Sequence, residues 1–230
     1  MPGKLEKKIS IKFLGTSSEE AIPYKDCDCL QCLSKDKKDL RRRSAILINK
    51  KILIDAGPDI LKQLRENQIN NLQAVLITHE HDDHNGGIKD LLKIRRDIRI
   101  IKLQAGQHFK LLGVDFHAFK VKHSKMVPTV GVEINSAVYM PDFADLDWAI
   151  KYLQESNVAI LDGTCLGSSF GGHLSMNESI GLTKPLKNLQ KIYFTHNGHN
   201  HRTQKEMEKL VQEIGDKRYS IAYDGLEIAV

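Results

Sequence analysis

The stretch THEHDDHNGG, residues 78–87, places three histidines and two aspartates in six consecutive positions. It overlaps the end of the apolar run AVLIT, which is typical of a buried β-strand. Because the chain is still extended where it leaves this strand, His79, His81 and Asp83 can lean to one side. His84 lies at the turn into a helix and can reach a different point. The stretch therefore predicts ligands for two metal ions that lie close together.

The rest of both ligand sets is expected at the ends of other strands. The segments KVKHSK, VYMPDF and IYFTHNG each place one imidazole or carboxylate directly after an apolar strand, and these residues are His123, Asp142 and His196. If these strand ends share one rim of the fold, they meet the histidine-rich loop. The first expected set is then His79, His81 and His123. The second is Asp83, His84 and His196, and Asp142 would bridge the two ions.

Strand and helix patterns alternate along the chain and predict one mixed α/β domain over residues 1–230. The strand patterns lie at 8–15, 44–57 (a hairpin that turns at Asn49–Lys50), 74–79, within 109–141, 157–164, 191–196 and in the terminal YSIAYDGLEIAV, which indicates two paired strands. The helix patterns lie at 58–68, 84–96, 145–156, 175–188 and 202–214.

The composition is that of an ordinary globular protein, with 41% hydrophobic and 27% charged residues. No apolar run approaches the roughly 20 residues of a membrane span, and the charged start MPGKLEKKIS does not resemble a secretory signal. We therefore expect a cytoplasmic protein without a membrane partner. The run KKDLRRR, 37–43, is interpreted as solvated surface, with attraction of an anionic substrate as the second interpretation. Aromatic residues make up only 6%, so nucleic acid is the less favoured partner.

Three of the four cysteines form a CxCxxC pattern within KDCDCLQCL, residues 25–33, and they are Cys27, Cys29 and Cys32. In a chain without a disulfide framework this spacing indicates metal ligands, and a closed structural zinc site needs four. Cys165 is placed in a predicted buried strand, far along the chain. His199, three residues after His196, is the better fourth ligand, because the cysteine loop and His196 both follow strands that end near one rim. The sequence thus predicts a Cys₃His zinc site.

The pattern HxHxDH, followed by His, Asp and His on later strands, resembles the metallo-β-lactamase superfamily. The segment ILIDAG, with Asp55, is similar to the second sequence hallmark of that superfamily. The resemblance covers nearly the whole chain. It implies an α/β fold, an αββα four-layer sandwich, with two divalent metal ions at one edge. It also implies that Asp55 supports the metal-ligand loop from outside the coordination sphere.

A narrower resemblance is to the phosphoribosyl cyclic-phosphate phosphodiesterases of phosphonate breakdown. It rests on GTSSEEAIPYKDCDCLQC, on HSK after a strand, on THNGH and on the terminal YDGLEI. In that family the cysteine loop, here at about 24–33, pairs with the second histidine of THxxH, which implies structural zinc on His199. The present chain is shorter and more basic, and the segment after 99 lacks the expected proline- and glycine-rich loop. These differences lie where substrate selectivity is expected.

The segment GGHLSMNES places His173 among glycines, just before a predicted helix. Superfamily phosphodiesterases, tRNase Z included, have a similar segment, which implies that His173 binds the substrate phosphate and can act as an acid. Asp162, in LDGT, is a candidate to support His173 or a metal ligand, and it is equally compatible with a structural role.

These features together predict a metal-dependent hydrolase of small phosphodiesters, cyclic ones included, with His173, Asp83 and Asp55 as its catalytic residues. The His and Asp ligands suit zinc, manganese or iron. A tRNase Z-like or other nuclease is one alternative. An oxidative or accessory protein resembling the pyrroloquinoline quinone biosynthesis member of the superfamily is a second, and a binding module with a vestigial site is a third. A homodimer is left open.

Overall fold

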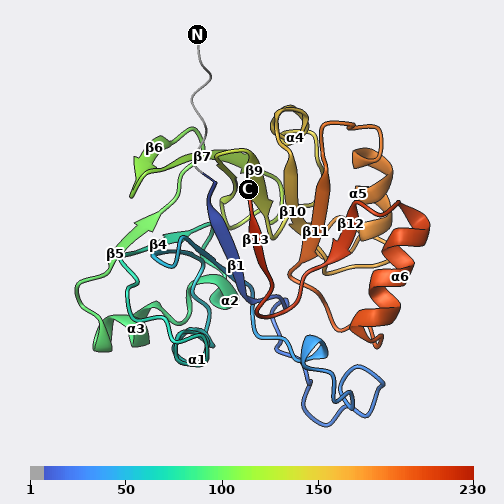
Figure 1. Ribbon diagram of the computed structural model, residues 1–230, viewed down its shortest axis with the longest axis horizontal. Coiled ribbons are helices and arrows are strands. Elements are labelled where there is room, and N and C mark those ends of the chain that lie inside the picture. The colour runs from blue at the N-terminus through green and yellow to red at the C-terminus, as the bar shows by residue number, and fades with distance from the viewer. Residues whose placement is uncertain (1–7) are drawn as a thin grey trace.

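The computed structural model describes residues 8–230 (Figure 1). The charged start MPGKLEKKIS, from which we predicted the absence of a secretory signal, lies mostly outside the described residues. Within residues 8–230, no helix combines the length and apolarity that crossing a bilayer requires.

Two mixed β-sheets form the centre of the fold. The first has the order β13-β1-β2-β3-β4-β5, with strands β13 (Glu227–Ala229), β1 (Ser10–Gly15), β2 (Ala45–Ile48), β3 (Ile52–Ile54), β4 (Ala74–Ile77) and β5 (Arg99–Lys102). The second has the order β12-β11-β10-β9-β8-β7-β6, with strands β12 (Tyr219–Ile221), β11 (Lys191–Thr195), β10 (Val158–Asp162), β9 (Ala137–Met140), β8 (Thr129–Ile134), β7 (Val114–Val121) and β6 (His108–Leu111).

Helices cover the outer face of each sheet, so the layers follow the predicted αββα order (Figure 1). They are α1 (Ile60–Glu66), α2 (Asp82–Asn85), α3 (Ile88–Ile94), α4 (Ile150–Glu155), α5 (Met176–Thr183) and α6 (Gln204–Ile214). One buried cluster joins the sheets, with Phe13 and Ile54 from the first and Phe116 and Tyr139 from the second. Two more clusters lie beneath the helices. Strands β2 and β4 are buried along their whole length because both faces of their sheet are covered.

The fold brings the ends of several strands to one rim. The histidine-rich loop follows β4, and single candidate ligands follow β7, β9 and β11. Strands β9, β10 and β11 are parallel neighbours, so their carboxyl ends lie side by side. This is the arrangement that the sequence predicts for the two ligand sets.

Several predicted elements differ in detail. The helix expected at 84–96 is two helices, α2 and α3, separated by Gly86–Gly87, and α4 is shorter than the pattern at 145–156. Strand β5 was not predicted, because its sequence RIIK is short and half-exposed. The prediction of paired C-terminal strands is wrong, since β12 pairs with β11 and β13 pairs with β1.

Two residues lie in surroundings other than those predicted. Cys165 is half-buried in the loop after β10, not in a buried strand. Arg41, in the basic run that we interpreted as solvated surface, is only 2% exposed. It donates to Thr16 Oγ1 at 2.7 Å and to the carbonyl of Ala222 at 2.5 Å, so it ties this run to the residues that follow β1 of the first sheet and β12 of the second.

Candidate metal centre

The first predicted set, His79, His81 and His123, comes together at the rim. Nε2 of His79 lies 3.0 Å from Nδ1 of His81, which lies 3.3 Å from Nε2 of His123. A zinc ion with Zn–N bonds of 2.0–2.1 Å separates its tetrahedral ligands by about 3.3 Å. The three ring nitrogens are therefore spaced as the ligands of one ion would be.

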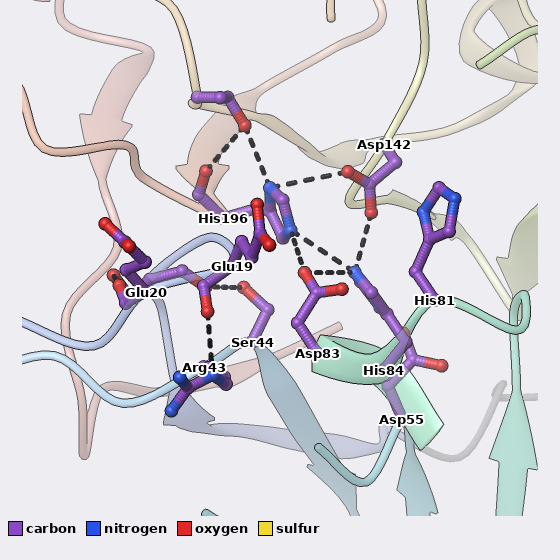
Figure 2. A network of polar contacts seen from close by, with 12 residues as sticks. Glu19, Glu20, Arg43, Ser44, Asp55, His81, Asp83, His84, Asp142 and His196 are labelled. Atoms are coloured by element: carbon purple, nitrogen blue, oxygen red, sulfur yellow. Dashed lines mark hydrogen bonds and ion pairs between the residues drawn. The ribbon is translucent and has the colours of Figure 1, made fainter. Parts of the chain in front are cut away.

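The second predicted set, Asp83, His84 and His196, lies beside the first (Figure 2). Nε2 of His84 is 3.2 Å from Nε2 of His196, and Oδ2 of Asp83 lies 3.2 Å and 3.1 Å from these two nitrogens. The two nitrogens and the carboxylate oxygen converge on one point. The histidine-rich loop thus contributes to two clusters, as its geometry predicts.

Asp142 lies between the two sets and is 1% exposed. Its Oδ2 is 2.9 Å from Nε2 of His84 and 3.8 Å from Nε2 of His79, yet no aligned N–H donates to it. A buried carboxylate oxygen without a hydrogen bond is costly unless a cation satisfies it. The donor set and this oxygen therefore fit a pair of divalent ions.

Four of the five histidines of these sets have a partner for their second ring nitrogen. Nδ1 of His84 lies 2.8 Å from the carboxylate of Asp55, and Nδ1 of His123 lies 3.0 Å from the carbonyl of Gly172. Hydroxyls serve the other two, with Thr78 at 3.0 Å from Nδ1 of His79 and Thr164 at 2.9 Å from Nδ1 of His196. Such contacts fix the tautomer and the orientation of a metal-ligating ring.

Asp55, which the sequence predicts to support the metal-ligand loop, contacts that loop at His84 and Thr78. Its carboxylate is fully buried and also accepts from the backbone N–H and the hydroxyl of Thr78. Asp55 has a φ of 65° and His196 a φ of 54°, values that cost energy in residues with a Cβ. The next glycine, Gly57, is required by space, because a Cβ there would lie 2.1 Å from the carbonyl oxygen of Asp83.

The electrostatics of the cluster keep its carboxylates ionised. Burial alone would raise the pKa of Asp142, but the neighbouring His196 and His84 hold it well below its usual range. Burial is likewise outweighed at Asp83, where hydrogen bonds from His196 and His84 lower the pKa. Burial and the adjacent His84 lower the pKa of His79 to about 2. The cluster thus presents anionic carboxylates and a neutral His79, the forms that bind metal.

His173 lies at the edge of the centre, on the short loop before α5. Its Nδ1 is 2.7 Å from Oδ2 of Asp162, which is fully buried. Burial opposes a charge on the ring, but the hydrogen bond and charge of Asp162 raise the pKa of His173 above its usual value. The contact fits the first of the two roles that the sequence left open for Asp162, support of His173.

The centre opens into a pocket of about 920 Å³. Two residues in its walls, Arg43 and Phe170, were not predicted from the sequence. Arg43 is held by the carbonyl of Glu19, 2.8 Å from its Nε, and by the carboxylate of Asp59, 3.1 Å from its Nη1. Phe170 is an exposed aromatic residue near the mouth. Neither carried a motif, although Arg43 lies in the basic run at 37–43.

The cysteine loop forms a separate cluster. Nε2 of His199 lies 3.5 Å from Sγ of Cys27, 3.2 Å from Sγ of Cys29 and 3.2 Å from Sγ of Cys32. One ring nitrogen cannot share a proton with three thiols at once, so this convergence fits a common cation. His201 lies near the cluster, with its ring 4.3 Å from that of His199.

Comparison with known proteins places the chain in a family. The family described as "Beta-lactamase superfamily domain" matches residues 50–101 and 93–219. A protein named octanoyltransferase, from Porphyromonas gingivalis, is 24% identical over 94% of this chain. The chain spans only about half the length of that relative (51%).

Solved structures share the whole fold. A diphosphatase of the PhnP family superposes with a TM-score of 0.84 at 23% identity, covering 96% of this chain and 97% of that one. Zinc-bound PqqB from Methylobacterium extorquens gives a TM-score of 0.77 at 19% identity, covering 96% and 100%. At these sequence identities the similarity concerns the fold alone. It confirms the predicted αββα sandwich in a single domain.

Proposed function

We propose that this chain, which belongs to the β-lactamase superfamily, is a metal-dependent hydrolase of small phosphodiesters. The superfamily fold implies binding of divalent metal, and known hydrolases share this fold. The observation that carries the finer proposal is the pair of ligand clusters joined by Asp142 and bordered by His173 and Arg43.

Seven side chains would hold the two ions: His79, His81, His123, Asp83, His84, His196 and Asp142. When bound, such an ion pair supplies Lewis-acid activation of a water molecule and of the phosphoryl oxygens. The three carboxylates of Asp55, Asp83 and Asp142 give the surroundings the negative charge that two dications require. Cys27, Cys29, Cys32 and His199 would hold a structural zinc ion that stabilises the loop at about 24–33.

His173 is the proposed proton donor to the leaving oxygen. Asp162 accepts from Nδ1 and thereby leaves Nε2 as the nitrogen available to a substrate. A hydroxyl leaves as its alcohol only if a proton reaches the oxygen as the P–O bond breaks. Arg43, fixed by Glu19 and Asp59, is the proposed electrostatic partner of the anionic phosphate.

The test is a substrate series with metal-loaded protein. We expect turnover of ribose cyclic phosphates and of other small diesters, and slower turnover of precursor tRNA. Faster cleavage of precursor tRNA would instead favour the nuclease alternative. Absence of diesterase activity with metal bound would favour the oxidative or binding alternatives.

We also propose that the protein works in the reducing cytoplasm. All four cysteines are free thiols, as expected where disulfides do not persist.

A further inference from the structure

The two most exposed large apolar side chains among the described residues are Met126 and Phe170, of which Phe170 lines the pocket. Met126 is 87% exposed and Phe170 is 80% exposed. They belong to two loops that touch, since Nδ1 of His123 lies 3.0 Å from the carbonyl of Gly172. Ser124, Lys125 and Phe170 line the pocket. Aromatic side chains that line a pocket are among the groups that contact ligands there.

The backbone fixes Phe170 relative to His173. The two residues exchange both backbone hydrogen bonds, at 3.1 Å and 2.9 Å, across a two-residue turn formed by Gly171 and Gly172. Both glycines have positive φ, 62° and 91°, as a tight hairpin turn requires. Residues paired in this way lie about 5.5 Å apart at Cα and project their side chains to the same face. Phe170 and His173 therefore leave the same face of the hairpin, and both line the pocket.

The hairpin is held at its base and at its turn. Ser169 Oγ accepts from the backbone N–H of Ser175 at 2.8 Å, at the start of α5. On the other side, Gly172 packs so closely that a Cβ there would lie 2.5 Å from the carbonyl oxygen of His123. An anchored loop presents its aromatic ring in one place, which reduces the entropy cost of stacking a ligand on it.

We propose that Phe170 is a stacking platform for a planar heteroaromatic ring in the leaving group of the substrate. This inference rests on the proposed function, in which His173 protonates the leaving oxygen. Because Phe170 shares the hairpin and the pocket with His173, it is placed on the side of the leaving group that His173 would protonate. The substrates are then nucleoside phosphodiesters or diphosphates rather than bare sugar phosphates. The Phe170 ring offers a flat apolar surface on which the base can stack, and Arg43 offers a positive charge to the phosphate.

The test is a binding titration, which does not depend on turnover. Metal-loaded protein is titrated by calorimetry with AMP and with ribose 5-phosphate, which lacks only the base. We expect AMP to bind more tightly by about fivefold to a hundredfold, the range of one base stacked on an aromatic side chain. Phe170→Ala should abolish this preference, Phe170→Trp should retain it, and Phe170→Leu, apolar but not flat, should lose most of it.

Trp148→Ala is the matched control, because Trp148 is a half-exposed aromatic residue (55%) that does not line the pocket. It should leave the preference for AMP unchanged. Equal affinities of the wild type for the two probes, or a preference that survives Phe170→Ala, would overturn the proposal. If AMP is preferred through Phe170 and no diester is hydrolysed, the proposed function fails while the stacking platform stands.

Discussion

Asp162 Oδ2 lies 2.7 Å from Nδ1 of His173, and this contact leaves Nε2 as the ring nitrogen that the proposed mechanism directs at the substrate. Asp162 is fully buried and its other oxygen accepts from the backbone N–H of Thr164 at 2.8 Å. The Thr164 N–H thus fixes the position of the Asp162 carboxylate, and the carboxylate fixes the orientation of the His173 imidazole. The pair resembles other arrangements in which a carboxylate orients a histidine that transfers a proton.

The first prediction concerns leaving groups. His173→Ala should cost little with bis(4-nitrophenyl) phosphate, whose nitrophenolate leaves without a proton, and about a hundredfold or more in kcat with a ribose hydroxyl as leaving group. Asp162→Asn should show the same selectivity with a smaller loss. Steady-state kinetics on both substrates decide the matter. An equal loss on both would mean that His173 positions the phosphate and does not donate a proton.

The second prediction concerns the cysteine loop. His199→Ala and Cys29→Ser should each remove one zinc ion per chain, measured by elemental analysis, because a Cys₃His site that loses a ligand is no longer closed. Unfolding should become easier by at least about 2 kcal/mol, or roughly 4–8 °C in Tm for a chain of this length. Cys165→Ser, which alters a thiol outside the cluster, should keep its zinc. Zinc content equal to the wild type in His199→Ala would refute the assignment.

The third prediction separates the charge of Asp55 from its backbone. Asp55 has a positive φ, which asparagine tolerates, so Asp55→Asn removes the charge beside His84 without adding strain. Affinity for active-site metal should fall by about 10- to 100-fold, as measured by competition with a chelator. Activity should recover at high metal concentration. Unaltered metal affinity would mean that the contact of 2.8 Å between Asp55 and His84 does not tune the centre.

The fourth prediction concerns Gly57. A methyl group there would meet the carbonyl oxygen of Asp83 at 2.1 Å, so Gly57→Ala should push the metal-ligand loop away from the first sheet. We expect a loss of about 1–3 kcal/mol in stability together with weaker metal binding. Gly181→Ala is the control, because a Cβ at this position in α5 meets nothing within 4 Å. It should stabilise the helix by about 0.5–1 kcal/mol. The reverse ranking in chemical denaturation would contradict the packing argument.

The sequence predicted the arrangement of the site better than its surroundings. Ligands spaced by one or two residues at a strand end, such as His79 and His81, are positioned by local geometry, and His123, Asp142 and His196 follow from strands that share a rim. Arg43 could not be recognised in the same way, because its place in the pocket depends on tertiary contacts with Glu19 and Asp59. Phe170 gave no periodic signal, since it occupies a loop.

In the fold, too, features that local sequence determines were predicted, and features that depend on tertiary contacts were not. The hairpin that turns at Asn49–Lys50 is confirmed, with both residues at positive φ, because a short turn between paired strands is encoded locally. The pairing of β12 and β13 was wrong because adjacent strand patterns do not reveal which sheet each strand joins. Arg41 appeared to be surface by composition, and only its buried partners, Thr16 and Ala222, explain its position.

The most direct test of the central claim is the hydrolysis of bis(4-nitrophenyl) phosphate, measured together with metal content, for the wild type and Asp142→Ala. Asp142 lies between the two ligand sets, and its Oδ2 has no hydrogen-bond donor. We predict diesterase activity with two active-site ions per chain in the wild type. In Asp142→Ala we predict fewer ions and a rate at least about a hundredfold lower. A metal-loaded wild type without diesterase activity, or an Asp142→Ala variant with full metal and full rate, would contradict the account.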